Sequence, residues 1–201
     1  MINQSPFNCS SEAPRAVDIA QGFIGQVLKS GDIAVDATAG NGNDTLFLAR
    51  LVGQAGRVYS FDIQEEALAE THRRLQGEAL TERVTLLNKG HEFMENFLDP
   101  GSCQAVMFNL GYLPGGNKEI KTLPRTTLGA AEQALNCLAP GGRLSMVVYR
   151  GHPGAREESG LLDDFISSLD PSLYWTARMV FPNMDNRSPY VIMVQKKGRC
   201  K

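Results

Sequence analysis

The feature that most constrains the fold is a regular alternation of short apolar segments with amphipathic ones. The short segments have the length and composition of buried β-strands, and we expect strands at residues 33–37, 57–62, 84–88, 105–110, 143–149, 174–181 and 190–196. Apolar residues recur at helical spacing within residues 17–28, 44–52, 65–76, 92–97, 128–138 and 161–169. Strands that alternate with helices predict a parallel sheet covered on both faces.

The last two strands are separated by a short polar loop, so they should form an antiparallel hairpin, because a parallel crossover needs about a dozen residues or more. A sheet of seven strands, of which the last is antiparallel, is the layout of Rossmann-like class I methyltransferases. The 201 residues, of which 42% are apolar, suffice for one such domain. We predict one α/β domain over residues 1–201, with flexible ends at 1–12 and 197–201.

Charge and cysteine content exclude several classes of protein. The chain has 20 Lys and Arg against 22 Asp and Glu, so it is not a strongly basic nucleic-acid binder, and any RNA contact must come from local patches. Cys9, Cys103, Cys137 and Cys200 never form a Cys-x-x-Cys pair, which indicates neither a zinc site nor a dithiol redox motif. We expect no metal.

The chain also has no apolar run near the roughly 18 residues that a membrane span requires. Its first 11 residues lack a basic region followed by an apolar stretch. We therefore expect a soluble cytoplasmic protein without a membrane partner. A homodimer would agree with the usual state of soluble proteins.

A glycine-containing turn follows the first predicted strand and precedes a helix. It reads Asp36-Ala-Thr-Ala-Gly-Asn-Gly-Asn-Asp-Thr45. Glycines let the backbone approach a ligand closely, and the helix N-terminus offers unpaired N–H groups. The turn therefore predicts a nucleotide-like cofactor, held by Asp36, Thr38, Gly40, Asn41, Gly42, Asn43, Asp44 and Thr45.

Two residues of this turn favour S-adenosylmethionine over a nicotinamide dinucleotide. A dinucleotide site favours Gly-x-Gly-x-x-Gly, whose second glycine admits the pyrophosphate, but the third glycine position here is Thr45. A carboxylate at the end of the strand, Asp36, suits a cationic amino-acid group better than phosphates.

Asp62 ends the second predicted strand, where an acidic side chain in a Rossmann-like unit can accept hydrogen bonds from ribose hydroxyls. We predict that Asp62, with Ile63 and Gln64, holds the ribose side of the cofactor. The alternative is that Asp62 only caps the helix that begins near Glu65.

The acceptor should lie beside the cofactor, because ligands of an open parallel sheet bind outside the carboxyl ends of its strands. Residues 109–114, 149–154 and 183–188 follow strands at that edge. The first segment resembles an altered Asn-Pro-Pro-Tyr motif of amino-group methyltransferases. Asn109 is expected to accept N–H bonds from the acceptor, and Tyr112 to stack on a base. The alternative for Tyr112 is a tyrosine that anchors the loop.

Methyl transfer is an in-line displacement in which the cofactor carries the activated group, so no protein nucleophile is required. An aminomethyl acceptor must lose a proton, and His152 is our candidate base; the alternative is a loop histidine bonded to backbone. His91 could lie beside the adenine, whereas His72 is expected on the surface.

Local polar and positive side chains near these loops are candidate RNA contacts. They are Lys118, Arg125, Arg150, Asn183 and Arg187. Each alone is more often a solvated surface residue than a phosphate contact.

Taken together, these residues resemble the MnmM-type tRNA wobble-uridine methyltransferases, a family also described as YtqB-like rRNA methylases. The resemblance spans nearly the whole chain. It is carried by the glycine turn, Phe61-Asp-Ile-Gln64, Gly90-His91, Asn109-Leu-Gly-Tyr-Leu-Pro-Gly-Gly-Asn-Lys118, Thr126-Thr127, and Tyr149-Arg-Gly-His-Pro-Gly154 followed by Glu157.

The resemblance implies transfer of a methyl group from S-adenosylmethionine to the amine of 5-aminomethyl-uridine, often 2-thiolated, at the tRNA wobble position. The products would be the 5-methylaminomethyl nucleoside and S-adenosylhomocysteine, and the partner would be the tRNA anticodon stem-loop. It also implies that Gly90, His91, Leu110 and Gly111, together with Asn109, line the cofactor site.

Three other functions remain open from the residues. The first is a methyltransferase that acts on ribosomal RNA or on a small amine. The second is a nicotinamide-dependent oxidoreductase, which the missing third glycine disfavours. The third is a nucleoside-binding module that has lost its chemistry.

Overall fold

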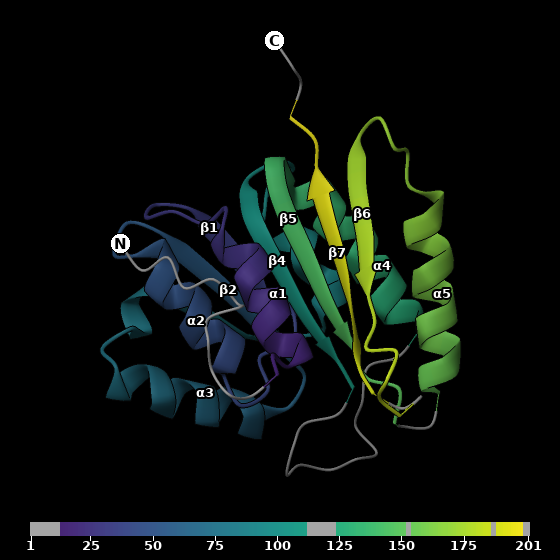
Figure 1. The fold of residues 1–201 in the computed structure, drawn as a ribbon. Helices are drawn as coiled ribbons and strands as arrows, with labels where there is room; N and C mark the ends of the chain where they lie inside the picture. Colours follow the sequence, from purple (N-terminus) through teal and green to yellow (C-terminus); the bar gives the residue numbers. More distant parts are fainter. Residues whose placement is uncertain (1–12, 112–123, 152–153, 186–187, 199–201) are drawn as a thin grey trace.

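The computed structural model describes residues 13–111, 124–151, 154–185 and 188–198, and the seven strands of these segments form one sheet (Figure 1). The order across the sheet is β3-β2-β1-β4-β5-β7-β6. The strands are β1 Ile33–Asp36, β2 Arg57–Asp62, β3 Val84–Asn88, β4 Cys103–Leu110, β5 Leu138–Val148, β6 Tyr174–Met179 and β7 Tyr190–Lys196.

Strand directions match the predicted layout. Strands β3, β2, β1, β4 and β5 pair in parallel, whereas β7 runs antiparallel to both β5 and β6. The predicted terminal hairpin is therefore confirmed. Because β1 pairs with β2 on one side and with β4 on the other, the strand order reverses at β1, which is where ligands bind in open sheets of this type.

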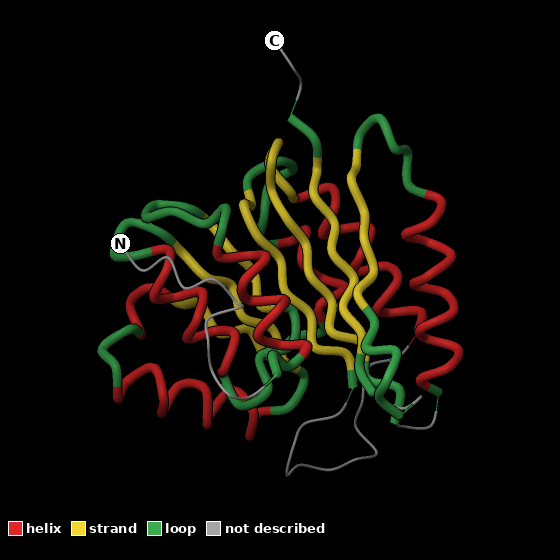
Figure 2. The backbone as a smooth tube through the Cα atoms, in the orientation of Figure 1, coloured by secondary structure: helices red, strands yellow, loops and turns green. Residues whose placement is uncertain are grey.

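Helices cover both faces of the sheet, as Figures 1 and 2 show. One face carries α1 Ala16–Gly25, α2 Asn43–Val52 and α3 Glu65–Gly77, and the other carries α4 Pro124–Cys137 and α5 Ala155–Ser168. Two short 3-10 helices, η1 Thr81–Arg83 and η2 His91–Asn96, precede and follow β3 in the chain. None of the helices in the described segments is long and apolar enough to cross a membrane.

The central strand β4 shows why these apolar runs become buried strands. Successive side chains of a strand point to opposite faces. Ala105 and Met107 accordingly join the core beneath α1 and α2, whereas Val106 and Phe108 join the core beneath α4. A strand that is buried on both faces needs a continuous apolar sequence.

Several element boundaries differ from the prediction by one or more residues, and two of these differences have a structural reason. The short helix near 92–97 is a 3-10 helix that begins at His91. Strand β5 begins at Leu138, which was expected on the preceding helix, because Leu138 pairs with Cys103 before the register shifts. The sequence Pro140-Gly-Gly142 thus lies within β5. An added Cβ at Gly142 would lie 2.9 Å from the carbonyl oxygen of Ala139, so this irregularity needs glycine.

Candidate active site

Asp36, the last residue of β1, anchors the glycine loop from beneath. It is fully buried. One carboxylate oxygen accepts the Thr38 N–H at 3.1 Å, and the other accepts the Thr45 hydroxyl at 2.6 Å. Thr45 is also buried, and its hydroxyl lies 2.7 Å from that of Ser60. The Thr45 side chain therefore supports Asp36 within the core, and its predicted contact with the cofactor stays a prediction.

The loop itself depends on glycine. Gly40 and Gly42 have φ values of +50° and +79°, in the left-handed region that other residues rarely adopt. A Cβ on Gly42 would lie 2.8 Å from the Thr71 hydroxyl. Gly42 is also the N-cap of α2, so the loop brings the backbone and the N-terminus of this helix to the carboxyl edge of the sheet, as predicted.

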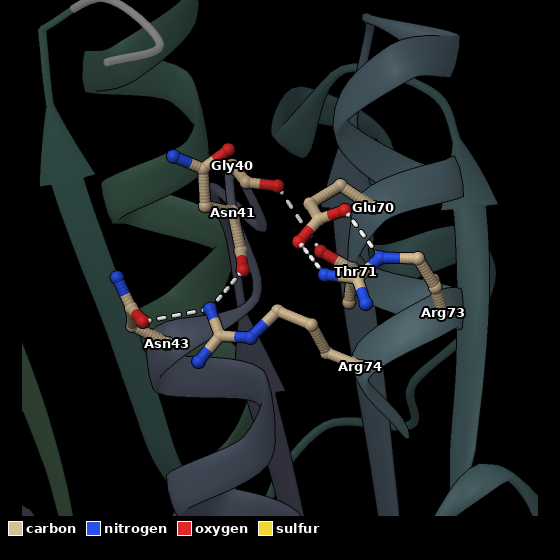
Figure 3. A network of polar contacts seen from close by, with 7 residues as sticks. All are labelled: Gly40, Asn41, Asn43, Glu70, Thr71, Arg73 and Arg74. Atoms are coloured by element: carbon tan, nitrogen blue, oxygen red, sulfur yellow. Dashed lines mark hydrogen bonds and ion pairs between the residues drawn. The ribbon is translucent and has the colours of Figure 1, made fainter. Parts of the chain in front are cut away.

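Two side chains of α3 hold the outer side of the loop (Figure 3). The Thr71 hydroxyl donates to the Gly40 carbonyl at 3.0 Å. Arg74 donates to the Asn41 carbonyl and, at 2.8 Å, to the Asn43 side-chain oxygen. Asn43, predicted as a cofactor contact, is exposed and helps to fix the loop. Sequence reasoning missed Thr71 and Arg74, because nothing in the helix α3 marks them.

Asp62, at the end of β2, is half-buried and connects two loops. Its carboxylate accepts the Gly40 N–H at 2.9 Å and the Gln64 N–H at 2.9 Å. The N-cap of α3 is Gln64, so the alternative that Asp62 merely caps this helix is wrong. Ile63 beside it is 59% exposed, which leaves an apolar side chain free at the predicted cofactor edge.

Two buried carboxyl groups, those of Asp36 and Asp44, lie beneath the loop. Burial and the nearby charge of Asp44 raise the pKa of Asp36 to about 7, against hydrogen bonds from Thr45 and Thr38 that lower it. Burial also raises the pKa of Asp44, opposed by hydrogen bonds from Gln21 and Asn109. A nearby cation would favour the ionised form of both carboxyls. The site therefore suits a positively charged ligand.

Asn109, near the end of β4, meets both the glycine loop and α2. Its backbone N–H donates to the Thr38 hydroxyl at 2.7 Å, and its side-chain Nδ2 donates to Asp44. Asp44 also accepts a bond from Gln21 Nε2 at 2.7 Å. The Asn109 Oδ1 is buried and has no hydrogen-bond partner in the described part of the chain. Leaving such an acceptor unpaired costs about 1–3 kcal/mol, so this atom is where a ligand N–H would be expected.

His91, the first residue of η2, is buried against the end of β1. Its Nδ1 lies 3.1 Å from the Ala37 carbonyl oxygen, and its ring packs edge-on against Phe108 at 5.6 Å. Burial lowers the pKa of His91, so the neutral ring donates its Nδ1 proton to that carbonyl. Gly90 is the N-cap of η2. His72 is exposed on α3, as predicted.

The end of β4 and the end of β5 contribute an aromatic side chain. Leu110 is fully buried, and its place in the cofactor site stays a prediction. A Cβ built on Gly111 would lie 3.5 Å from Tyr149. Tyr149 is 38% exposed, and burial, together with the charge of Asp44, raises its pKa. The sequence predicted Tyr149 at this edge only as a member of the segment 149–154, without a role of its own.

The remaining predicted residues are spread along this edge or fall outside the described residues. Arg125 is exposed in the first turn of α4, and Asn183 is exposed between β6 and β7. The Arg150 guanidinium lies 4.4 Å from the centre of the Tyr190 ring. Tyr112, Lys118, His152 and Arg187 lie outside the described residues.

A buried acid was also missed. Glu158 on α5 is 1% exposed and accepts the Thr127 hydroxyl at 2.7 Å, whereas Glu157, which was singled out, is exposed. The helical spacing of the buried residues Ala155, Glu158, Leu162 and Ile166 places Glu158 on the inner face of α5. This spacing is present in the sequence and could have identified Glu158 as a buried residue.

Comparison with known proteins gives a family and close structural relatives. The model of the family described as "Putative rRNA methylase" matches residues 58–195. An Arabidopsis thaliana protein named tRNA (mnm(5)s(2)U34)-methyltransferase, chloroplastic, is 44% identical over 167 residues, which are 79% of the chain. The chain spans about three fifths of that relative, 61% of its length.

Two solved structures share the whole architecture. A protein from Clostridium thermocellum, described in the same words as the family, superposes with a TM-score of 0.89 at 40% identity. A candidate methyltransferase from Streptococcus mutans, solved in complex with SAH, has a TM-score of 0.83 at 36% identity. Each comparison covers 92% of this chain and 99% of the other.

Proposed function

Because the chain belongs to the family described as "Putative rRNA methylase", we propose that it transfers a methyl group from S-adenosylmethionine to an amine on RNA. Its fold is that of the Rossmann-like class I methyltransferases, as predicted. The acceptor that we propose is the amine of 5-aminomethyl-uridine, with or without a 2-thio group, at the tRNA wobble position. The name of the Arabidopsis relative supports this choice.

The residues of the carboxyl edge fit this cofactor. The S. mutans relative was solved with SAH. The hydrogen bond from the Gly40 N–H to Asp62, at the carboxyl edge where ligands of such sheets bind, supports a ribose site at Asp62. The carboxylates of Asp36 and Asp44 provide negative charge for a ligand that carries sulfonium and ammonium groups. When bound, S-adenosylmethionine supplies a methyl group already activated for transfer.

The observation that carries the proposal is the buried Oδ1 of Asn109 beside the glycine loop, which has no hydrogen-bond partner among the described residues. A neutral amine that donates an N–H to this oxygen has its lone pair directed elsewhere, toward the methyl carbon. The nitrogen then forms the new N–C bond as the S–C bond breaks, and the nitrogen afterwards loses a proton. Alignment of this kind supplies much of the acceleration, so Asn109 acts by orienting the acceptor.

The RNA would approach from the same edge. Arg125 and Arg150 follow β4 and β5, whose carboxyl ends carry Asn109 and Tyr149. Positive side chains there are suited to phosphate contacts that position the acceptor nucleoside. The net charge of −2 means that such contacts are local.

The test is methyl transfer from labelled S-adenosylmethionine to tRNA that carries 5-aminomethyl-2-thiouridine, followed by mass spectrometry of the nucleosides. We expect conversion to the 5-methylaminomethyl nucleoside. Asn109→Ala should lower kcat by about a hundredfold and leave cofactor affinity within about twofold. Label that enters ribosomal RNA and not tRNA would support the rRNA substrate of the family description, and cofactor binding without transfer to either RNA would overturn the proposal.

A further inference from the structure

Three elements meet through one chain of side-chain hydrogen bonds. Gln21 of α1 donates from Nε2 to one oxygen of Asp44 at 2.7 Å, and Asn109 of β4 donates from Nδ2 to the other oxygen. Asp44, in the first turn of α2, is 2% exposed. Both oxygens of one buried carboxyl therefore have an amide donor, and the two donors come from positions 23 residues before it and 65 residues after it.

The chemistry of Asp44 fixes which way the Asn109 amide points. Asp44 accepts hydrogen bonds from both amides. Because an ionised carboxylate only accepts hydrogen bonds, in that state Asn109 turns its NH₂ group toward Asp44 and its Oδ1 away. That oxygen is one of three buried side-chain atoms that have no hydrogen-bond partner in the described segments. If the amide turned over, an NH₂ group would face the acceptor, and an N–H of the acceptor amine would find no oxygen to receive it.

Gln21 completes the arrangement on the other side of Asp44. A buried carboxylate is costly unless its oxygens are hydrogen bonded, and Gln21 satisfies the oxygen that Asn109 does not reach. Without Gln21, the Asp44 carboxyl is free to take up a proton or to rotate. A protonated Asp44 would donate to Asn109 Oδ1 and so occupy the atom needed for the acceptor.

We propose that Gln21 and Asp44 are positioning residues that hold the Asn109 carbonyl oxygen toward the acceptor, so that the site selects an N–H donor. The inference rests on the proposed methyl transfer to an amine and adds the two residues that orient it. Neither residue needs to touch the acceptor.

The kinetic test uses Gln21→Leu, which removes the donor. We expect kcat to fall about tenfold or more, with KM for S-adenosylmethionine little changed. The matched control is Gln26→Leu at the end of the same helix, whose side chain accepts a bond from Arg143 and does not contact Asp44; it should keep wild-type kcat. In an Asn109→Ala background, Gln21→Leu should lower kcat by less than about twofold, because the effects of two residues that act through one interaction are not additive.

A second test needs no substrate. In protein labelled with ¹⁵N-asparagine, the Asn109 side-chain amide is identified by its loss in Asn109→Ala. Its resonance should shift in Gln21→Leu and in Asp44→Asn, and stay in place in Gln26→Leu. An unmoved Asn109 resonance in Asp44→Asn, or fully additive kinetic losses, would overturn the inference. If the wild-type protein transfers no methyl group to RNA, the proposed function fails, and this spectrum still decides whether Asp44 and Gln21 orient Asn109.

Discussion

The Gly40 amide donates a hydrogen bond to Asp62 Oδ2 at 2.9 Å, which ties the glycine loop after β1 to the end of β2. The other Asp62 oxygen accepts the Gln64 N–H, so one carboxylate organises the backbone on both sides of the proposed ribose position. A carboxylate has about four acceptor sites, which leaves capacity for ligand hydroxyls.

Asp62→Ala should weaken S-adenosylmethionine binding about ten- to hundredfold, because it removes charge-assisted hydrogen bonds both to the loop and to the ribose. Isothermal titration calorimetry measures the dissociation constant. The control is Asp164→Ala, which changes an exposed aspartate of α5 and should leave the affinity unaltered. Unchanged affinity in Asp62→Ala would remove Asp62 from the site.

Gly42→Ala should destabilise the protein by more than about 1 kcal/mol and weaken cofactor binding, because the residue has φ +79° and its Cβ would meet Thr71. Gly129→Ala is the matched control. Gly129 lies inside α4 with open space around its Cβ position, so alanine there should stabilise by about 0.5–1 kcal/mol. Urea denaturation compares the two, and equal free energies of unfolding would contradict the strain at Gly42.

Arg74→Met should lower cofactor affinity several-fold by releasing the Asn41 carbonyl and the Asn43 side chain, while the helix α3 remains intact. The neighbouring Arg73→Met is a close control. Arg73 pairs at 2.6 Å with Glu70 on the exposed side of the same helix (Figure 3), and exposed pairs of this kind contribute little. Calorimetric titration of both variants should separate them; equal affinities would show that Arg74 does not hold the loop.

The raised pKa of Asp36 predicts a pH dependence of stability. In the unfolded chain this carboxyl has its ordinary pKa of 3.8, whereas in the fold its pKa is about 7. Between these values the folded state keeps a proton that the unfolded state has lost, so its contribution to stability falls as pH rises through this range and is constant above it. Asp36→Asn removes the titration.

Urea denaturation at pH 5 and pH 8 tests this prediction. The free energy of unfolding of Asp36→Asn minus that of wild type should be larger at pH 8 than at pH 5. For the same reason, a cationic cofactor should bind wild type more tightly as pH rises toward 7, because it favours the ionised Asp36. A difference between wild type and variant that does not change with pH would contradict the raised pKa.

The sequence by itself determined the elements and their order. Residues 57–62, 84–88 and 190–196 were predicted as strands with the bounds that the structure has, because strand periodicity and turn residues are properties of a short stretch of chain. The same local signals placed the glycine loop after β1, the terminal hairpin and, through chain order, Asp62 and Asn109 at one edge of the sheet.

Only the tertiary structure decided which side chains touch. Gln21, Asp44 and Asn109 lie on three separate elements, and Thr71 and Arg74 reach the glycine loop from a helix whose sequence does not mark them. It also decided that Thr45 faces the core and that Glu158, rather than Glu157, is buried. The physical reason is the distance along the chain over which each feature is determined. Periodicity is local and decides which face of an element is apolar. Contacts between polar side chains depend on how elements far apart in the chain pack together.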